Sequence, residues 1–85
     1  MDPTAAEAFY NLASCHLDQG NLPEAVLNYE KAIDAAEHPN LDSYLSLASA
    51  LQLDLQNERA TFVLNQAREL LGDEPSILAA LQGNF

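Results

Sequence analysis

The stretch Gln19-Gly20-Asn21-Leu22-Pro23-Glu24-Ala25 separates two segments that are rich in helix-forming residues. Gly20 can supply the left-handed residue with which many helices end. Pro23 suits the first turn of the following helix, where its missing N–H would be unpaired in any case. The stretch therefore predicts two helices joined by a short turn.

The remaining glycines and prolines divide the chain into further helices. No segment alternates with a period of two residues, so we expect no strand and an all-α fold. Asp2, Asn40 and Asn57 are the expected caps of the first, third and fourth helices, and Asn21 or Leu22 that of the second. The five helices are predicted over about residues 3–19, 23–37, 41–53, 58–71 and 75–82.

Within each predicted helix, apolar residues recur at the spacing of one buried face. Cys15 is expected to point toward the partner helix as a small buried apolar side chain. His16 is expected to pack on the buried face of the first helix. His38 is expected in the loop before Pro39, as a cation favoured by the dipole at the C-terminus of the second helix. The four faces comprise Phe9, Leu12, Ala13 and His16; Ala25, Val26, Tyr29, Ala32 and Ile33; Tyr44, Leu47, Ala48 and Leu51; and Ala60, Val63 or Leu64, Ala67 and Leu71.

The chain also resembles itself at an offset of 35 residues. A helix–turn–helix unit with this period is typical of a repeat protein. Leu55 stands where the first turn has Gly20, so the second turn should be distorted or lengthened, with a strain of about 1 kcal/mol if Leu55 is left-handed. The matching pairs include Phe9 with Tyr44, Leu12 with Leu47, Ala13 with Ala48, Ala25 with Ala60, and Ala32 with Ala67.

These segments are similar to the tetratricopeptide repeat family. Residues 6–13 resemble the opening of its first helix, residues 19–25 its turn, and residues 29–33 its second helix. One domain is expected over residues 1–85, with one repeat at about 6–39, a second at about 41–75 and a C-terminal helix at about 75–82. The resemblance implies an α-solenoid of stacked helix pairs that binds other proteins and is not an enzyme.

The resemblance also implies a concave surface lined by the first helix of each repeat. Helical spacing and the offset of 35 indicate which side chains would face it. The family members that clamp a C-terminal carboxylate use Lys and Asn there, and only Asn11 is present, so that function is not expected. The predicted groove comprises Glu7, Tyr10, Asn11, Ser14, Leu17, Asp18, Asp42, Leu45, Ser49, Gln52 and Leu53.

Composition excludes several classes of function. Three Lys and Arg stand against 13 Asp and Glu, which gives a net charge of −10. Nucleic acids and anionic membranes are therefore not expected partners. The chain has a single Cys and neither a signal peptide nor a membrane span, which suggests the cytoplasm or another reducing soluble compartment. No catalytic, metal, cofactor or small-molecule substrate motif is recognisable.

Three functions remain open on the sequence. The first is a scaffold or interaction module that binds an apolar or basic peptide, or a partner helix, in the groove. The second is a structural unit that associates with copies of itself or forms part of a longer solenoid. The third is a small acidic chaperone for a basic client. An expected contact patch at the C-terminal end comprises Leu78, Leu81 and Phe85, with Leu70 and Leu71 beside it.

Overall fold

The computed structural model describes residues 3–82, with the backbone alone described at residues 3 and 4. These residues contain helices and no strand, which confirms the all-α fold class. The predicted Asp2 cap and Phe85 lie outside the described residues. The helices are α1 (Pro3–Asp18), α2 (Leu22–Ala35), α3 (Leu41–Leu53), α4 (Asn57–Leu71) and α5 (Pro75–Leu81).

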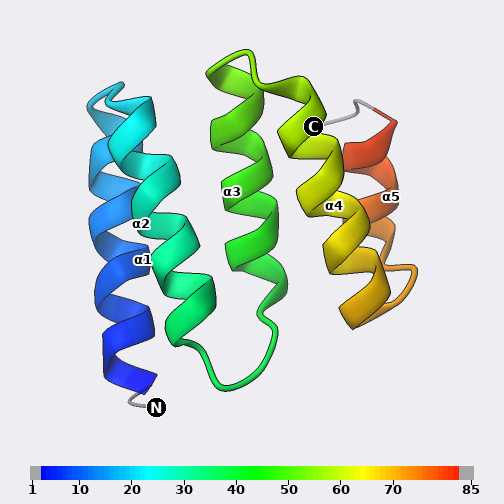
Figure 1. Cartoon of the computed structure of the whole chain (residues 1–85), viewed down its shortest axis with the longest axis horizontal. Helices are drawn as coiled ribbons and strands as arrows, with labels where there is room; N and C mark the ends of the chain where they lie inside the picture. The colour runs from blue at the N-terminus through cyan, green and yellow to red at the C-terminus, as the bar shows by residue number, and fades with distance from the viewer. Residues whose placement is uncertain (1–2, 83–85) are drawn as a thin grey trace.

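The helices stand side by side in a slab with extents of 31 × 28 × 16 Å. Figure 1 shows the α1–α2 hairpin at one side, α3 in the middle, and α4 and α5 at the other side. The main contacts join α1 to α2, α2 to α3, α3 to α4, and α5 to both α3 and α4. The observed arrangement is a helical repeat, in which each element packs chiefly on its neighbours.

The first turn closes with the hydrogen bonds of a Schellman motif. The N–H of Asn21 donates to the carbonyl of His16 at 2.8 Å, and the N–H of Gly20 donates to that of Leu17 at 3.0 Å. Gly20 has a φ of +75°. The glycine is therefore the left-handed residue that the sequence predicts.

The second turn repeats this pattern 35 residues later. The N–H of Gln56 donates to Leu51 at 2.8 Å, and that of Leu55 donates to Gln52 at 3.0 Å. Leu55 has a φ of +61° and its side chain is 84% exposed. Leu55 is thus left-handed, and the turn keeps the length of the first turn, so the expected lengthening is not observed.

Three predicted caps lie in the described part of the chain, and one of them is wrong. Asn21, one of the two alternatives for α2, is its N-cap but makes no side-chain capping bond. The side chain of Asn40 accepts a hydrogen bond from the N–H of Ser43 at 3.2 Å, as an N-cap should. Asn57 is not the cap of α4. The N-cap is Gln56, which makes no side-chain capping bond, because the Schellman turn ends there and the helix begins one residue earlier than predicted.

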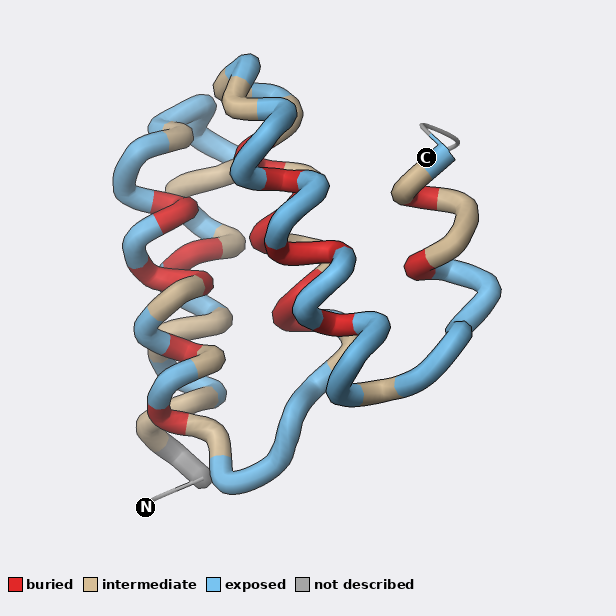
Figure 2. The backbone as a smooth tube through the Cα atoms, turned by 45° about the vertical axis from the view of Figure 1, so that its right-hand side comes forward, coloured by how far each residue is buried: buried red, intermediate tan, exposed pale blue. Residues whose placement is uncertain are grey.

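The core lies between the hairpins and is built from alanines alternating with larger side chains. Figure 2 shows the buried residues as bands on the helices, while the connections are exposed. The faces predicted for α2, α3 and α4 are buried except for half-buried Ile33 and Leu71. The largest fully buried side chains are Tyr29, Leu51 and Leu64 on these faces and Ile77 on α5. Small residues let the helices approach, and the large ones fill the remaining space.

The face predicted for α1 is only partly correct. Ala13 is fully buried, Phe9 and His16 are half-buried, and Leu12 is 48% exposed. Cys15 is exposed and does not point into the helix pair. The main packing partner of α1 is α2, so its buried stripe is narrower than that of a helix packed on two sides.

Candidate functional site

The predicted groove residues divide into two groups along α1 and α3. The half-buried group is Tyr10, Ser14, Leu17, Leu45, Ser49 and Gln52. The exposed group, which is available to a ligand, is Glu7, Asn11, Asp18, Asp42 and Leu53.

Tyr10 of α1 contacts side chains of both α2 and α3. Its ring meets that of Tyr29 edge to face, with centroids 5.5 Å apart and planes at 70°. Its hydroxyl is 3.3 Å from the Oγ of Ser46 on α3. Tyr10 is therefore held by α2 on one side and by α3 on the other, which fixes a half-buried aromatic ring in the surface.

Ser14 supports the same arrangement one helical turn further along α1. Its Oγ is 3.1 Å from the hydroxyl of Tyr29, which is itself 2% exposed. The buried phenol thus has a hydrogen-bond partner, as buried hydroxyls require. Ser14 serves to anchor Tyr29, and through Tyr29 it positions the ring of Tyr10.

A hollow of about 340 Å³ brings four of the predicted groove residues together. They are Glu7, Tyr10 and Asn11 from α1 and Asp42 from α3. The prediction missed Asn40 and Ser43, which also line the hollow, and Ser46, which bonds Tyr10. Ser46 could have been predicted, because it lies 35 residues after Asn11. Asn40 and Ser43 could not, because their places in the lining depend on the path of the connection between α2 and α3. The predicted residues that do not line this hollow are Ser14, Leu17, Asp18, Leu45, Ser49, Gln52 and Leu53.

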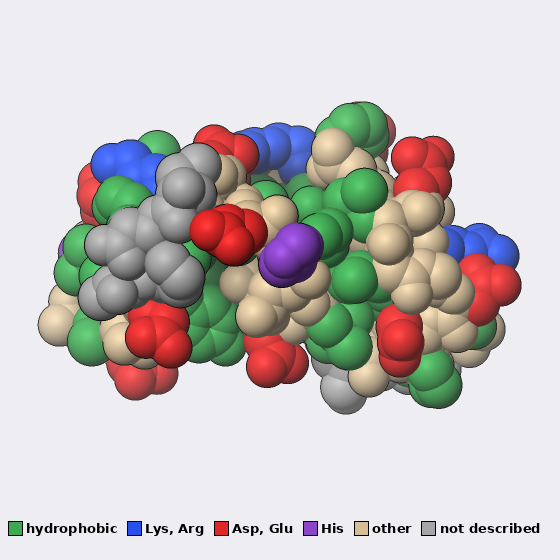
Figure 3. All heavy atoms as spheres, turned by 90° about the horizontal axis from the view of Figure 1, so that it is seen from below, with side chains coloured by type: hydrophobic (Ala, Val, Ile, Leu, Met, Phe, Trp, Pro, Cys, Tyr) green, Lys and Arg blue, Asp and Glu red, His purple; other side chains and the backbone are tan. Residues whose placement is uncertain are grey.

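The charge around this hollow is negative. Neither α1 nor α3 contains Lys or Arg, whereas α1 has Glu7 and Asp18 and α3 has Asp42. The basic residues all lie on α2 and α4 and have partners of their own. Figure 3 shows acidic side chains spread over the face at this end of the molecule. Lys31 lies over the ring of Phe9 at 5.7 Å, Arg59 pairs with Glu30, and Arg68 pairs with Asp73.

The described residues offer no arrangement for metal binding. Across residues 3–82, no three His, Cys, Asp or Glu side chains come together in a group that could hold an ion. His16 instead receives a contact of 3.4 Å at its Nδ1 from the amide of Asn21, which closes the first turn. The hollow at Glu7 and Asp42 is lined by polar and carboxylate side chains together with three alanines, a mixture found in ligand-binding sites.

The predicted C-terminal patch is described in part. Leu78 and Leu81 are half-buried on α5, and Leu70 on α4 is 53% exposed. Ile77 is fully buried and anchors α5. Phe85 lies outside the described residues, so its place in a patch stays a prediction.

Residues 6–38 match the profile of the family described as Tetratricopeptide repeat. The match covers most of α1, the first Schellman turn and all of α2. This first hairpin is therefore similar to a tetratricopeptide repeat. Such repeats generally mediate protein–protein interaction and are typically not enzymes.

Comparison with curated proteins and with solved structures gave no match. In the part of the chain that the structure describes, every helix is too short or too polar to cross a membrane. The similarity of residues 6–38 to a tetratricopeptide repeat is consistent with protein–protein interaction as the general class of function.

Proposed function

We propose that this tetratricopeptide repeat chain binds a basic peptide segment in the groove formed by α1 and α3. The observation that carries the proposal is the pairing of Glu7 and Asp42 at one hollow, beside Tyr10 and Asn11, on two helices without Lys or Arg. The first helices of the two hairpins contribute one carboxylate each to this hollow.

Each lining group has a chemical role in such binding. The carboxylates attract Lys and Arg side chains and accelerate association by electrostatic steering. The amides of Asn11 and Asn40 can both donate to and accept from a peptide backbone. Tyr10 is already fixed by its contacts with Tyr29 and Ser46, so little side-chain entropy is lost when a ligand packs on its ring.

A second candidate function is assembly of this chain through the end formed by α4 and α5. In this candidate the chain is one domain, and its second hairpin, at about residues 41–75, acts as a further repeat. The supporting observation is Leu70 of α4, which is 53% exposed, while Leu71 of α4 and Leu81 of α5 are half-buried. Sedimentation equilibrium of the wild type and of Leu70→Ser tests this candidate. A dimer that becomes a monomer supports it, and a wild type that is monomeric at high concentration contradicts it.

The groove proposal is tested with a labelled 12-residue peptide of alternating Lys, Ser and Leu, by stopped-flow fluorescence anisotropy at several salt concentrations. In the double variant Glu7→Lys and Asp42→Lys, association should slow about tenfold and its salt dependence should flatten. The matched control is Glu24→Lys with Glu69→Lys, which makes the same change in net charge at exposed positions of α2 and α4.

Equal slowing in both double variants would contradict the proposal, because only the overall charge would then matter. An unchanged rate and salt slope in the groove variant would contradict it as well. Circular dichroism should show the same helix content in all three proteins, since the four substituted residues are exposed.

A further inference from the structure

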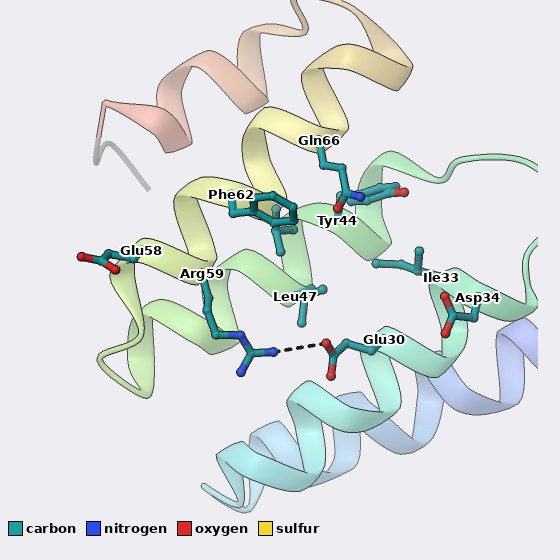
Figure 4. A pocket seen from close by; sticks show the side chains of 10 residues that line it. Glu30, Ile33, Asp34, Tyr44, Leu47, Glu58, Arg59, Phe62 and Gln66 are labelled. Atoms are coloured by element: carbon teal, nitrogen blue, oxygen red, sulfur yellow. Dashed lines mark hydrogen bonds and ion pairs between the residues drawn. The ribbon is translucent and has the colours of Figure 1, made fainter.

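A second hollow, of about 520 Å³, opens between α2 and α4, with α3 at its floor. Figure 4 shows lining side chains from the three helices around the hollow, with Glu58 pointing away from the others. It shares no lining residue with the hollow at Glu7 and Asp42. It is therefore a separate surface, whose properties do not depend on the proposed peptide groove of α1 and α3.

The floor and one wall of this second hollow are apolar. Leu47 and Val63 are buried in the core beneath it, and Ile33 is half-buried at its side. Phe62 lines it from α4 with 67% of its surface exposed. A large aromatic side chain beside an apolar floor has the composition of an interface anchor, because burying the ring releases apolar surface from water.

One end of the hollow is closed by a bridge between α4 and α2. A guanidinium nitrogen of Arg59 lies 3.2 Å from a carboxylate oxygen of Glu30. Arg59 also donates to the amide oxygen of Gln56 at 2.7 Å, and Gln56 donates to Asp54 at 2.7 Å. Among the residues that the structure describes, Arg59 is the only cationic side chain that lines the hollow, and it is already bonded to Glu30 and Gln56.

The other end of the hollow carries an unbalanced negative charge. Figure 4 places Asp34 at the end away from Arg59, on the same helix as Glu30. Among residues 5–82 no Lys, Arg or His pairs with Asp34. Its carboxylate lies close enough to Tyr44, also in the lining, to act on that phenol electrostatically. An incoming cation would therefore find a carboxylate next to the apolar floor.

From this combination we propose that the α2–α4 hollow is a second docking surface, for a basic amphipathic helix of a partner protein. A bulky apolar side chain of that helix inserts between Ile33, Leu47 and Phe62, and a Lys or Arg one turn away pairs with Asp34. The hollow is too small for a whole helix, whose diameter is about 10 Å, so only the side chains of one face enter it.

Charge decides between a basic partner and a second copy of this chain. Each copy carries a net charge of −10, and the free charges at this surface, Asp34 and Glu58, are negative. The surfaces of two copies would therefore repel each other, whereas a basic helix is attracted to this surface. The aromatic face of Phe62 is also suited to a neighbouring ammonium or guanidinium group.

The test uses the full chain labelled with ¹⁵N and a 14-residue helix-forming peptide of Ala, Leu and Lys, with Leu at every third or fourth position. Titration should shift the amide resonances around Asp34, Leu47 and Phe62. Phe62→Ala should weaken binding by about tenfold, as expected for an aromatic anchor. Asp34→Asn should weaken it about threefold, as expected for an exposed ion pair.

Matched controls lie on the two helices that form the hollow. Leu27→Ala removes an exposed apolar side chain of α2 outside the hollow, and Glu69→Gln removes an exposed carboxylate of α4. Both should leave the affinity within about twofold. Because Phe62 and Asp34 are exposed, neither test variant should unfold the protein, and the amide spectrum of each free variant checks this.

Four outcomes would overturn the inference. The first is an affinity that is unchanged in both test variants, and the second is a set of shifts confined to α1 and the groove face of α3. The third is the absence of shifts at about 1 mM peptide. The fourth is a set of shifts at the α2–α4 hollow that depend on protein concentration alone, which would assign the surface to a second copy. The double variant Glu7→Lys and Asp42→Lys should still bind this helical peptide at the α2–α4 hollow. Failure of one surface is thereby distinguished from failure of the other.

Discussion

The turn between α1 and α2 and the turn between α3 and α4 have the same hydrogen bonds but different residues at the left-handed position. Gly20 has a φ of +75° and Leu55 has a φ of +61°. In each turn the two carbonyls that accept the Schellman bonds lie three and four residues before this position. The comparison shows that the hairpin geometry, and not the residue present, determines the conformation of the turn.

The difference between the turns lies in their energy. A residue with a Cβ is strained by about 1–2 kcal/mol in the left-handed region, and glycine is not. Leu55 gains little in return from burial, since it is 84% exposed. The hydrogen-bonded side chains of Asp54, Gln56 and Arg59 lie beside it and continue to Glu30 on α2. The second turn is thus anchored to the first hairpin, while the first turn has no such bridge among the described residues.

The largest expected effect comes from overpacking the two hairpins at matched positions. Ala25 and Ala60 are both fully buried where the helices of each hairpin approach each other. Ala25→Leu and Ala60→Leu should each lower the free energy of unfolding by about 1–3 kcal/mol, because the added methylenes have no space. Urea denaturation measures both. An unchanged midpoint for either variant would mean that the two hairpins are not packed alike.

Transferring the leucine to the first turn should have the next largest effect. A Cβ built at Gly20 meets no atom within 4 Å, so Gly20→Leu introduces backbone strain without a clash. The free energy of unfolding should fall by about 1–2 kcal/mol. Thermal and urea unfolding check the value, with Gly72→Leu as a comparison at another left-handed glycine (φ +87°) with open space. An unchanged free energy of unfolding in Gly20→Leu would show that the first turn changes conformation to relieve the strain, whereas the second turn keeps its left-handed residue.

The reverse change in the second turn should be smaller and stabilising. Leu55→Gly removes the strain but makes the unfolded chain more flexible, so a net gain of about 0.5–1 kcal/mol is expected. Leu55→Ala serves as the control, because it keeps the strain and removes the exposed side chain. If the glycine variant is less stable than the wild type, the side chain of Leu55 contributes packing that its exposure does not suggest.

The smallest effect concerns the aromatic position that differs between the hairpins, Phe9 in the first and Tyr44 in the second. Burial, and to a lesser extent the carboxylate of Asp34, raises the pKa of Tyr44 above its usual range. The folded state therefore keeps the phenol proton more tightly than the unfolded state. The contribution to stability is complete below about pH 10 and is lost as the pH rises through the folded pKa.

The measurement is the free energy of unfolding of the wild type and of Tyr44→Phe at pH 9 and pH 11. The wild type should lose more stability than the variant between these values. Equal losses in the two proteins would show that the other tyrosines account for the alkaline effect.

Much of this fold was predictable because helix signals and the repeat of 35 residues agree along the chain. The buried faces of α2, α3 and α4 follow from apolar spacing, and Gly20, Gly72 and Asn40 occupy the positions predicted for them. Exposure on α1 was not predictable from the same spacing. The spacing of Leu12 and Cys15 is that of a helix buried on two sides, but the main packing partner of α1 is α2 alone.

The candidate sites were predictable to a lesser extent. Glu7, Tyr10, Asn11 and Asp42 were placed on one surface by helical spacing and by the offset of the repeat, and they line one hollow. Spacing along single helices cannot show which side chains meet across helices. The hydrogen bond of Tyr10 with Ser46 and the α2–α4 hollow with Phe62 depend on the angle between the hairpins, which packing determines.

The packing of each helix chiefly on its neighbours along the chain has a consequence for the kinetics of folding. Contacts close in sequence cost little loop-closure entropy, so the chain should fold on the microsecond to millisecond scale of small helical proteins. Local unfolding should begin at the ends of the row of helices, since α5 has its main contacts with α3 and α4 alone. Amide hydrogens of α5 should therefore exchange with solvent through local openings, while those of α3, which packs on α2, α4 and α5, exchange only when the whole domain unfolds.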